Sequence, residues 1–79
     1  MNRPHRSAKK VKGHYANYIE IGHNAFEFVF DFSRFYPDIQ EADFCARIFI
    51  SPGCAKELFI ILGESIEQYI KNFESSQNR

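Results

Sequence analysis

The stretch from Phe26 to Phe32 alternates between phenylalanine and other residues, and this alternation constrains the fold more than any other feature. Four rings occur at every second position, with Glu27, Val29 and Asp31 between them. Side chains two residues apart share one face of a β-strand, whereas a helix would distribute them around its axis. The stretch therefore predicts a strand with one buried aromatic face and a second face that carries two acids.

Two further segments have strand character and predict a three-stranded antiparallel meander. Residues 14–22 alternate in the same way, and Gly22-His23-Asn24 has the composition of a turn, so this segment and the phenylalanine strand form an expected hairpin. Residues 33–43 are interpreted as a long connection with a turn at Pro37-Asp38. A third strand is expected from Phe44 to Ile50, with Phe44, Ala46, Ile48 and Ile50 on one side.

Polar residues within these strands test the pattern. Arg47 is expected on the face that carries Glu20, Glu27 and Asp31, where a cross-strand ion pair accounts for its presence without any ligand. Asn17 falls among the apolar positions of its strand and is the one residue that contradicts the alternation.

A long helix is predicted after the third strand. Ser51 is a favoured N-cap residue, and Pro52 is tolerated in the first turn. Apolar residues then recur at helical spacing over about five turns. They are Ala55, Leu58, Phe59, Leu62, Ile66, Tyr69, Ile70 and Phe73. The expected fold is α+β: a three-stranded antiparallel β-meander followed by one long C-terminal amphipathic helix packed on one face, the phenylalanine face.

Size and aromatic content predict self-association. A chain of 79 residues buries only about 60% of its unfolded surface, yet this one contains nine Phe and four Tyr. A homodimer or a dimer of dimers would cover the surplus. The outer side of the sheet and the first half of the helix are the expected oligomer interface. The residues predicted there are Tyr18, Val29, Phe49, Ile60 and Ile61.

Charge is distributed unevenly along a chain of zero formal charge. Residues 1–13 contain five basic residues and no acid. Residues 14–79 contain the other five basic residues and all ten acids. We expect a flexible basic arm over 1–13, a single β-β-β-α domain over 14–75 and a frayed C-terminus over 76–79. The arm is interpreted as a solvated tail; the alternative is a segment that binds nucleic acid. Its basic residues are Arg3, Arg6, Lys9, Lys10 and Lys12.

The chain lacks the residue patterns of common catalytic and metal sites. Cys45 and Cys54 lie nine positions apart without a zinc-knuckle spacing, so no metal or cofactor is predicted. Cys54 is interpreted as a small packing residue, with a redox role as the alternative. An enzyme that uses Glu27, Asp31 and His23 is the last-ranked hypothesis, and no catalysis is predicted.

Cellular location is predicted from three absences. No apolar run approaches the roughly 20 residues of a membrane-spanning helix. The basic N-terminus is not followed by the apolar segment of a secretory signal. Two cysteines are too few for a disulfide scaffold. A cytoplasmic protein is expected.

Several short blocks resemble a known family. They are Ala16-Asn17-Tyr18, Gly22-His23-Asn24 with Glu27-Phe28 and Asp31-Phe32, and Arg47-Ile48 with Ser51-Pro52 and Ala55-Lys56. Together they are similar to a short prokaryotic domain family of unknown function, over roughly Tyr15 to Phe73. The resemblance implies a bacterial intracellular protein and a strand-strand-strand-helix unit, with no activity or catalytic residue.

The functional expectation follows from surplus apolar surface and absent site chemistry. It is a non-catalytic oligomeric protein-binding or adaptor module of unknown pathway, with a homo-oligomer and a possible protein partner. The alternative is a nucleic-acid-associated protein that uses its basic N-terminal arm.

Overall fold

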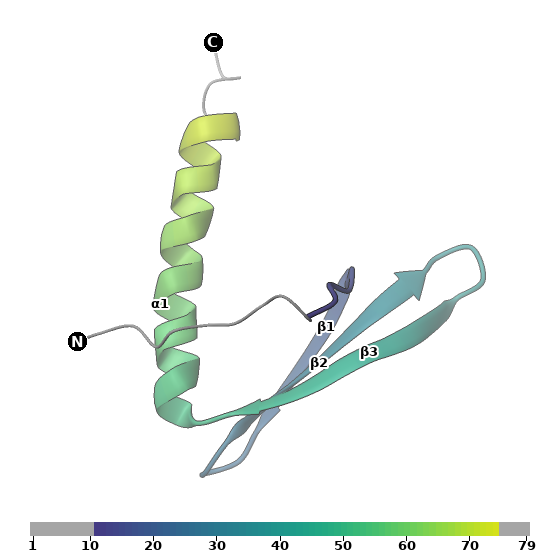
Figure 1. The fold of residues 1–79 in the computed structure, drawn as a ribbon, viewed down its shortest axis with the longest axis horizontal. Coiled ribbons are helices and arrows are strands. Elements are labelled where there is room, and N and C mark those ends of the chain that lie inside the picture. Colours follow the sequence, from purple (N-terminus) through teal and green to yellow (C-terminus); the bar gives the residue numbers. More distant parts are fainter. Residues whose placement is uncertain (1–10, 75–79) are drawn as a thin grey trace.

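The computed structural model describes residues 11–74, which form three strands followed by a helix (Figure 1). The strands are β1 (Tyr18–His23), β2 (Phe28–Tyr36) and β3 (Glu41–Ile50). The helix α1 (Pro52–Tyr69) continues into a π-helical turn η1 (Ile70–Glu74). The sheet order is β1-β2-β3 and both pairings are antiparallel. The predicted α+β meander with a C-terminal helix is confirmed.

The strand register sorts the side chains onto two faces. Phe30 of β2 pairs with Ile21 on one side and Ile48 on the other, and Asp31 pairs with Glu20 and Arg47. Paired residues share a face of the sheet. We call one face the inner face: Ile19, Ile21, Phe28, Phe30, Phe32, Ala46, Ile48 and Ile50. We call the other the outer face: Tyr18, Glu20, Gly22, Val29, Asp31, Arg47 and Phe49.

The first hairpin turn lies two residues later than predicted. Gly22 and His23 belong to β1, and the turn is closed by the Asn24 amide, which donates to the Glu27 carbonyl at 3.0 Å. The Asn24 side-chain oxygen also accepts from the backbone amides of Phe26 at 2.7 Å and Glu27 at 3.0 Å. This local bonding holds Phe26 in the turn, where it is 82% exposed. The expectation that Phe26 joins the row of buried rings is therefore wrong.

The predicted long connection over 33–43 is also wrong, because most of it is strand. β2 continues to Tyr36, and Arg34 and Phe35 pair with Asp43 and Ala42 of β3. The turn is confined to residues 37–40, which begin at the predicted Pro37. It closes with Gln40 at a φ of 54°. Backbone pairing between β2 and β3 thus holds most of this segment.

Two local features, a β-bulge and the side chain of Asn17, depart from regular alternation in the sheet. A β-bulge between Phe32 and Ser33 pairs Phe32 with Ala46 but Ser33 with Phe44, so Cys45 is the extra residue. Phe44 therefore moves off the inner face, contrary to the expected alternation. Asn17 is explained as well, since its side chain bonds the Phe35 backbone, accepting from N–H at 2.6 Å and donating to C=O at 3.1 Å.

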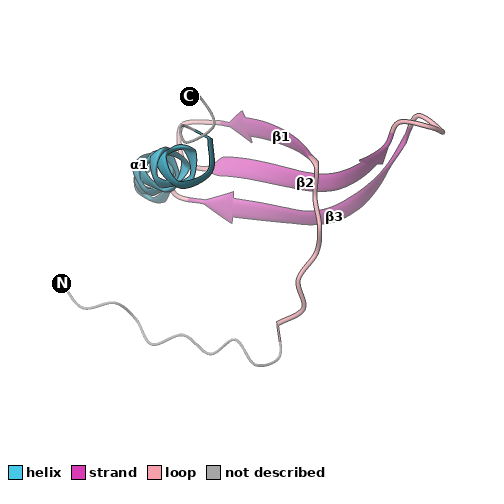
Figure 2. Cartoon of the chain, turned by 90° about the horizontal axis from the view of Figure 1, so that it is seen from above, coloured by secondary structure: helices cyan, strands magenta, loops and turns pink. Residues whose placement is uncertain are grey.

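The helix begins as predicted. Ser51 adopts an extended conformation, its hydroxyl accepts from the Cys54 amide at 3.1 Å, and Pro52 follows in the first turn. Figures 1 and 2 show α1 rising from one end of the sheet, so that only its first turns lie beside the strands. None of the residues that the structure describes is buried. Phe28, Phe30 and Phe32 are half-buried, mainly by their neighbours on the sheet.

Candidate interaction surface

An apolar groove lies between the inner face and the first turns of α1. Phe28 is central to it, because it lies beside Ala55 and Phe59 of the helix. The remaining walls come from both elements, and the lining is almost entirely apolar. They are Ile21 and Phe30 on the sheet and Leu58 and Leu62 on the helix. We call this the groove; it is open to solvent, and Phe59 on its wall is 79% exposed.

The two walls of the groove come from two sequence patterns, the alternation of the strands and the helical spacing of α1. Most apolar residues of α1, with the exception of Ile60 and Ile61, fall on one stripe, and its first members are the helix wall of the groove. The stripe continues beyond Leu62 through Ile66, Tyr69 and Ile70, which are 49%, 52% and 41% exposed. The rings of Tyr69 and of Phe73 in η1 lie tilted to each other with their centres 5.3 Å apart. The later turns stand clear of the strands (Figure 1).

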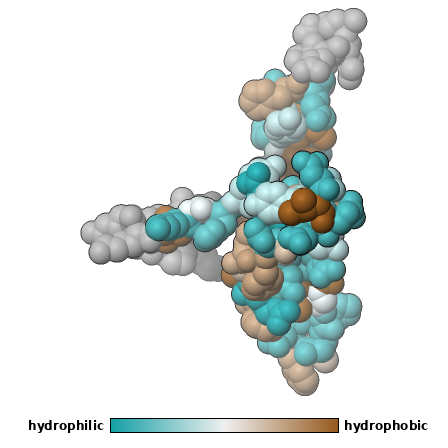
Figure 3. Space-filling model, turned by 90° about the vertical axis from the view of Figure 1, so that its right-hand side faces the viewer, coloured by the Kyte–Doolittle hydropathy of each residue, from teal (hydrophilic) through white to brown (hydrophobic). Residues whose placement is uncertain are grey.

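The surface is a mixture of apolar and polar residues. Figure 3, seen from the side of the β2–β3 hairpin, shows apolar side chains between polar ones on both the sheet and the helix. Exposed large side chains on the inner face include Ile19 at 52% and Ile21 at 60%. Exposed apolar side chains that gather on one face in this way are typical of interaction sites.

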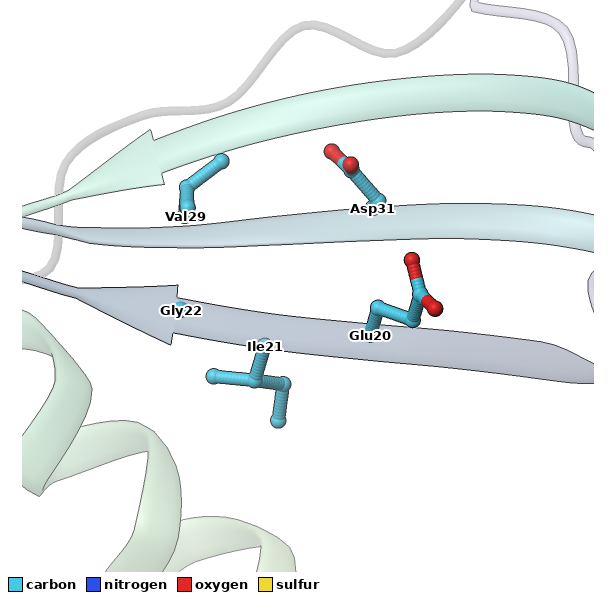
Figure 4. A pocket seen from close by; sticks show the side chains of 5 residues that line it. All are labelled: Glu20, Ile21, Gly22, Val29 and Asp31. Atoms are coloured by element: carbon cyan, nitrogen blue, oxygen red, sulfur yellow. The ribbon is translucent and has the colours of Figure 1, made fainter.

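The outer face carries the polar chemistry of the sheet. Arg47 binds the Asp31 carboxylate with two bonds, Nε to Oδ1 at 2.7 Å and Nη2 to Oδ2 at 2.8 Å. The Tyr18 hydroxyl donates to Glu20 at 3.0 Å. Glu20 and Asp31 are direct cross-strand neighbours, and Figure 4 shows both carboxylates on the opposite side of the sheet from Ile21. Each acid of this pair thus has its own donor.

These bonds shift the ionisation of the groups that make them. The hydrogen bond from Arg47 is the main reason that the pKa of the Asp31 carboxyl is lowered, with partial desolvation opposing it and the Arg47 charge adding to it. The same bond raises the pKa of Arg47. The pKa of Tyr18 is raised first by its bond to Glu20 and then by the Glu20 charge. All three shifts belong to contacts that hold the outer face together.

The structure divides the predicted oligomer interface between two surfaces. Tyr18, Val29 and Phe49 share the outer face; Val29 and Phe49 are cross-strand partners, whereas Tyr18 faces Ser33 further along the sheet. Ile60 and Ile61 are about half exposed on the helix, and Ile60 also borders the groove beside Lys56. Whether another chain covers either surface stays a prediction.

The register does not bring the predicted acid cluster together, and it separates residues that the enzyme hypothesis uses. Glu27 lies in the hairpin turn and not beside Glu20 and Asp31. His23 pairs with Phe28 on the inner side, its ring stacked on the Phe28 ring at 5.2 Å, whereas Asp31 is on the outer face. The sheet therefore separates Asp31 from His23, whereas Glu27 lies in the turn beside the end of β1.

Other predicted residues are placed only in part. Arg3, Arg6, Lys9 and Lys10 of the basic arm lie outside the described residues. Lys12 is exposed. Cys45 and Cys54 are free thiols, the first half-buried at the bulge and the second exposed in the first turn of α1. The expectation that Cys54 is a buried packing residue is wrong, because nothing packs over the first turn on that side.

Two features of the surface were not predicted from the sequence. Arg34 lies between two rings, with its guanidinium 5.0 Å from the Tyr15 ring centre and 5.3 Å from that of Tyr36. Its i+2 relation to Tyr36 would have predicted one of these contacts once residues 33–36 were recognised as strand. The groove itself was missed because it depends on the direction in which the helix leaves β3.

No group of three His, Cys, Asp or Glu side chains with metal-binding geometry occurs within residues 11–74. Over the same range, no helix combines the length and the apolar character needed to span a membrane. The fold and its surfaces define a small α+β module with an uncovered apolar face. The chain belongs to a family described as a protein of unknown function (DUF3467), which matches residues 3–76. No curated protein and no solved structure matches the chain.

Membership in this family confirms the resemblance to a family of unknown function. It covers nearly the whole chain, including the residues of both sheet faces and of α1. The family description carries no activity, so the function has to be inferred from the surfaces.

Proposed function

We propose that this protein is a non-catalytic oligomeric module that binds protein. The observation that carries the proposal is the absence of any buried residue among residues 11–74, although apolar side chains line the inner face and one stripe of α1. A stable domain requires apolar burial of order 25 cal/mol per Å² to offset the entropy of ordering its chain. Another polypeptide that covers these surfaces supplies that burial.

The exposed area supports this proposal. The chain exposes 7594 Å². Its fifteen residues outside the described range contribute at most about 2,600 Å², the area of an unfolded chain of that length. The remaining body exposes about 5,000 Å², whereas a compact body of that mass exposes about 4,200 Å². The difference, about 800 Å², is what each partner contributes to a standard protein interface.

The shape leads to the same conclusion. The radius of gyration is 16.2 Å, whereas a compact domain of 79 residues has a radius of about 11.6 Å. The helix standing clear of the sheet adds to this extent (Figure 1). So extended a shape supports the proposal that another chain covers these surfaces.

Protein suits these surfaces better than other ligand classes. The groove is apolar and offers no cation to a phosphate beyond Lys56 at its rim. On the outer face the carboxylates of Glu20 and Asp31 disfavour a polyanion, while Tyr18, Val29 and Phe49 provide apolar contact area around a satisfied ion pair. We propose that the inner face serves assembly and that the outer face receives the protein partner.

Unfolding at different protein concentrations tests the oligomeric part of the proposal. If folding requires association, the thermal midpoint rises with chain concentration, because mass action stabilises the folded oligomer. The measurement is circular dichroism of the full chain over a hundredfold range of concentration. A midpoint that does not change with concentration would contradict the proposal.

Site-specific photo-crosslinking tests the outer face. A photoreactive residue at Phe49 is expected to give a discrete product with a second protein in the native host. The same residue at Glu64, an exposed position of α1, is the matched control. Products that are identical from both positions would refute a partner site on the outer face.

A second candidate is nucleic-acid binding through the basic arm, favoured by five basic residues within positions 1–13. Replacing Arg3, Arg6, Lys9, Lys10 and Lys12 by Gln would then abolish salt-dependent binding of a DNA or RNA oligonucleotide. Fluorescence anisotropy measures this binding. Affinity that is unchanged by the replacements would exclude the arm.

A further inference from the structure

We infer that the groove and the inner face are covered by α1 of a second copy of this chain, in a two-fold dimer with reciprocal helix-on-sheet contacts. This inference rests on the proposed function and names the occupant of the assembly surface. Four observations on the described residues support it: the corner between β3 and α1, the dimensions of the two surfaces, their lack of charge and the uncovered area.

The corner between β3 and α1 prevents the helix from covering its own sheet. β3 ends at Ile50 and α1 begins at Pro52, so Ser51 is the only connecting residue. Ser51 has φ −71° and ψ 159°, the extended conformation that a following proline enforces. Connections that return a helix onto its sheet need about 2–6 residues. The helix therefore leaves the end of the sheet, and its later turns project beyond it (Figures 1 and 2).

The helix is long enough to cover the apolar part of the inner face. α1 contains 18 residues and is about 27 Å long. β2 contains 9 residues and is about 30 Å long, and its apolar stretch from Phe28 to Phe32 accounts for about 17 Å of this. Two strand spacings give the sheet a width of about 10 Å, close to the diameter of one helix. One helix laid along the inner face would cover this apolar stretch and leave Arg34 at the rim.

The two surfaces are alike in having no charge to desolvate. On the inner face up to Phe32 the only titratable side chain is His23 at its end, stacked on Phe28. The helical stripe from Ala55 to Ile70 contains only apolar residues and Tyr69. Contact between them would bury no unpaired ion, which is the costly term in most interfaces. Arg34 lies beyond the apolar stretch, where it stays at the rim of the contact.

A second copy fits these surfaces because each chain carries both halves of the contact. A two-fold axis repeats the contact of helix on sheet, so both inner faces and both stripes are covered at once and the assembly closes. An unrelated partner that covered the inner face would leave the apolar stripe of α1 exposed, and one that covered the stripe would leave the inner face exposed. The uncovered area of about 800 Å² per chain gives about 1,600 Å² for the pair, a standard interface.

A crosslinking experiment with two different variants tests the reciprocal arrangement. In a background of Cys45→Ser and Cys54→Ser, one copy carries Ala46→Cys on the inner face, and a tagged copy carries Ile66→Cys on the helix. The two are unfolded, mixed, refolded and treated with a short bis-maleimide. We expect a mixed covalent dimer in good yield, identified by the mass of the tag.

Two controls make the result specific. In the first control, Ser33→Cys replaces Ala46→Cys and places the thiol on the outer face of the sheet. In the second, Glu64→Cys replaces Ile66→Cys and places the thiol on the opposite side of the helix. Each control is expected to lower the yield of the mixed dimer at least tenfold. A dimer whose controls crosslink equally well would overturn the reciprocal arrangement while leaving the oligomeric module intact. A monomer without any mixed product would overturn both.

Discussion

The two faces of the sheet differ in how far one chain can satisfy them. On the outer face, Arg47 pairs with Asp31, and Tyr18 bonds Glu20, so the polar groups have partners within the sheet. Up to Phe32 the inner face offers only apolar side chains and His23, and the first turns of α1 border no more than its end. Polar side chains can form hydrogen bonds and ion pairs with neighbours in the same sheet, whereas apolar side chains are buried only when another element packs over them. This difference supports our proposal that the inner face is an assembly surface.

The largest expected effect is that of a charge on the inner face. Phe30→Asp would place a carboxylate in the covered core and lower the free energy of unfolding by more than about 4 kcal/mol, enough to prevent folding. Urea denaturation followed by circular dichroism measures it. Val29→Asp, the adjacent residue on the outer face, is the matched control, with an expected loss of about 1 kcal/mol. Equal losses from both variants would remove the distinction between the faces.

A charge on the helix stripe tests the other half of the same contact. Ile66 is 49% exposed in one chain, so a monomer would tolerate Ile66→Asp with a change below about 0.5 kcal/mol. In the dimer the residue is covered, and the loss of about 3 kcal/mol weakens association roughly a hundredfold. Sedimentation velocity over a dilution series measures the dissociation constant. Gln68→Asp places the same charge on the polar side and should leave association unchanged.

The N-cap gives a smaller effect that is independent of assembly. Ser51→Ala removes the oxygen that accepts from the Cys54 amide and lowers the free energy of unfolding by about 1 kcal/mol. Ser51→Asp retains an acceptor and serves as the conservative control. The urea midpoint distinguishes the two variants. If Ser51→Ala were as stable as the wild type, the helix start would not depend on this bond.

The smallest effect is the pH dependence of the outer face. The pKa of Asp31 is lowered in the folded protein, so its contribution to stability is present above the unfolded value of about 3.9 and is lost as pH falls through the folded value. Asp31→Asn should flatten the fall in unfolding free energy below pH 4. The contribution is modest because the Arg47 side chain is 55% exposed. A wild-type pH profile identical to that of the variant would contradict the pairing.

Much of the sheet could be predicted because alternation is a local property of the chain. The spacing of Phe28, Phe30 and Phe32 determines their common face, and Arg47 then falls opposite Asp31. Ser51-Pro52 likewise predicts the helix start from local capping chemistry. These inferences need no knowledge of how the elements are arranged in space.

The errors arose where a single residue changes the geometry. The Asn24 side chain holds Phe26 in the turn, and the extra residue at Cys45 moves Phe44 off the inner face. The groove depends on the extended Ser51, which sets the direction of α1. Alternation and helical spacing report which face a residue shares, but they contain no information on the angle between a strand and the helix that follows it.

Sedimentation equilibrium of the full chain at micromolar concentration tests the central claim most directly. If another copy covers the inner face, the measured mass is an even multiple of the 9.3 kDa chain, as a dimer or a dimer of dimers. A cooperatively folded species with the mass of one chain would contradict the account.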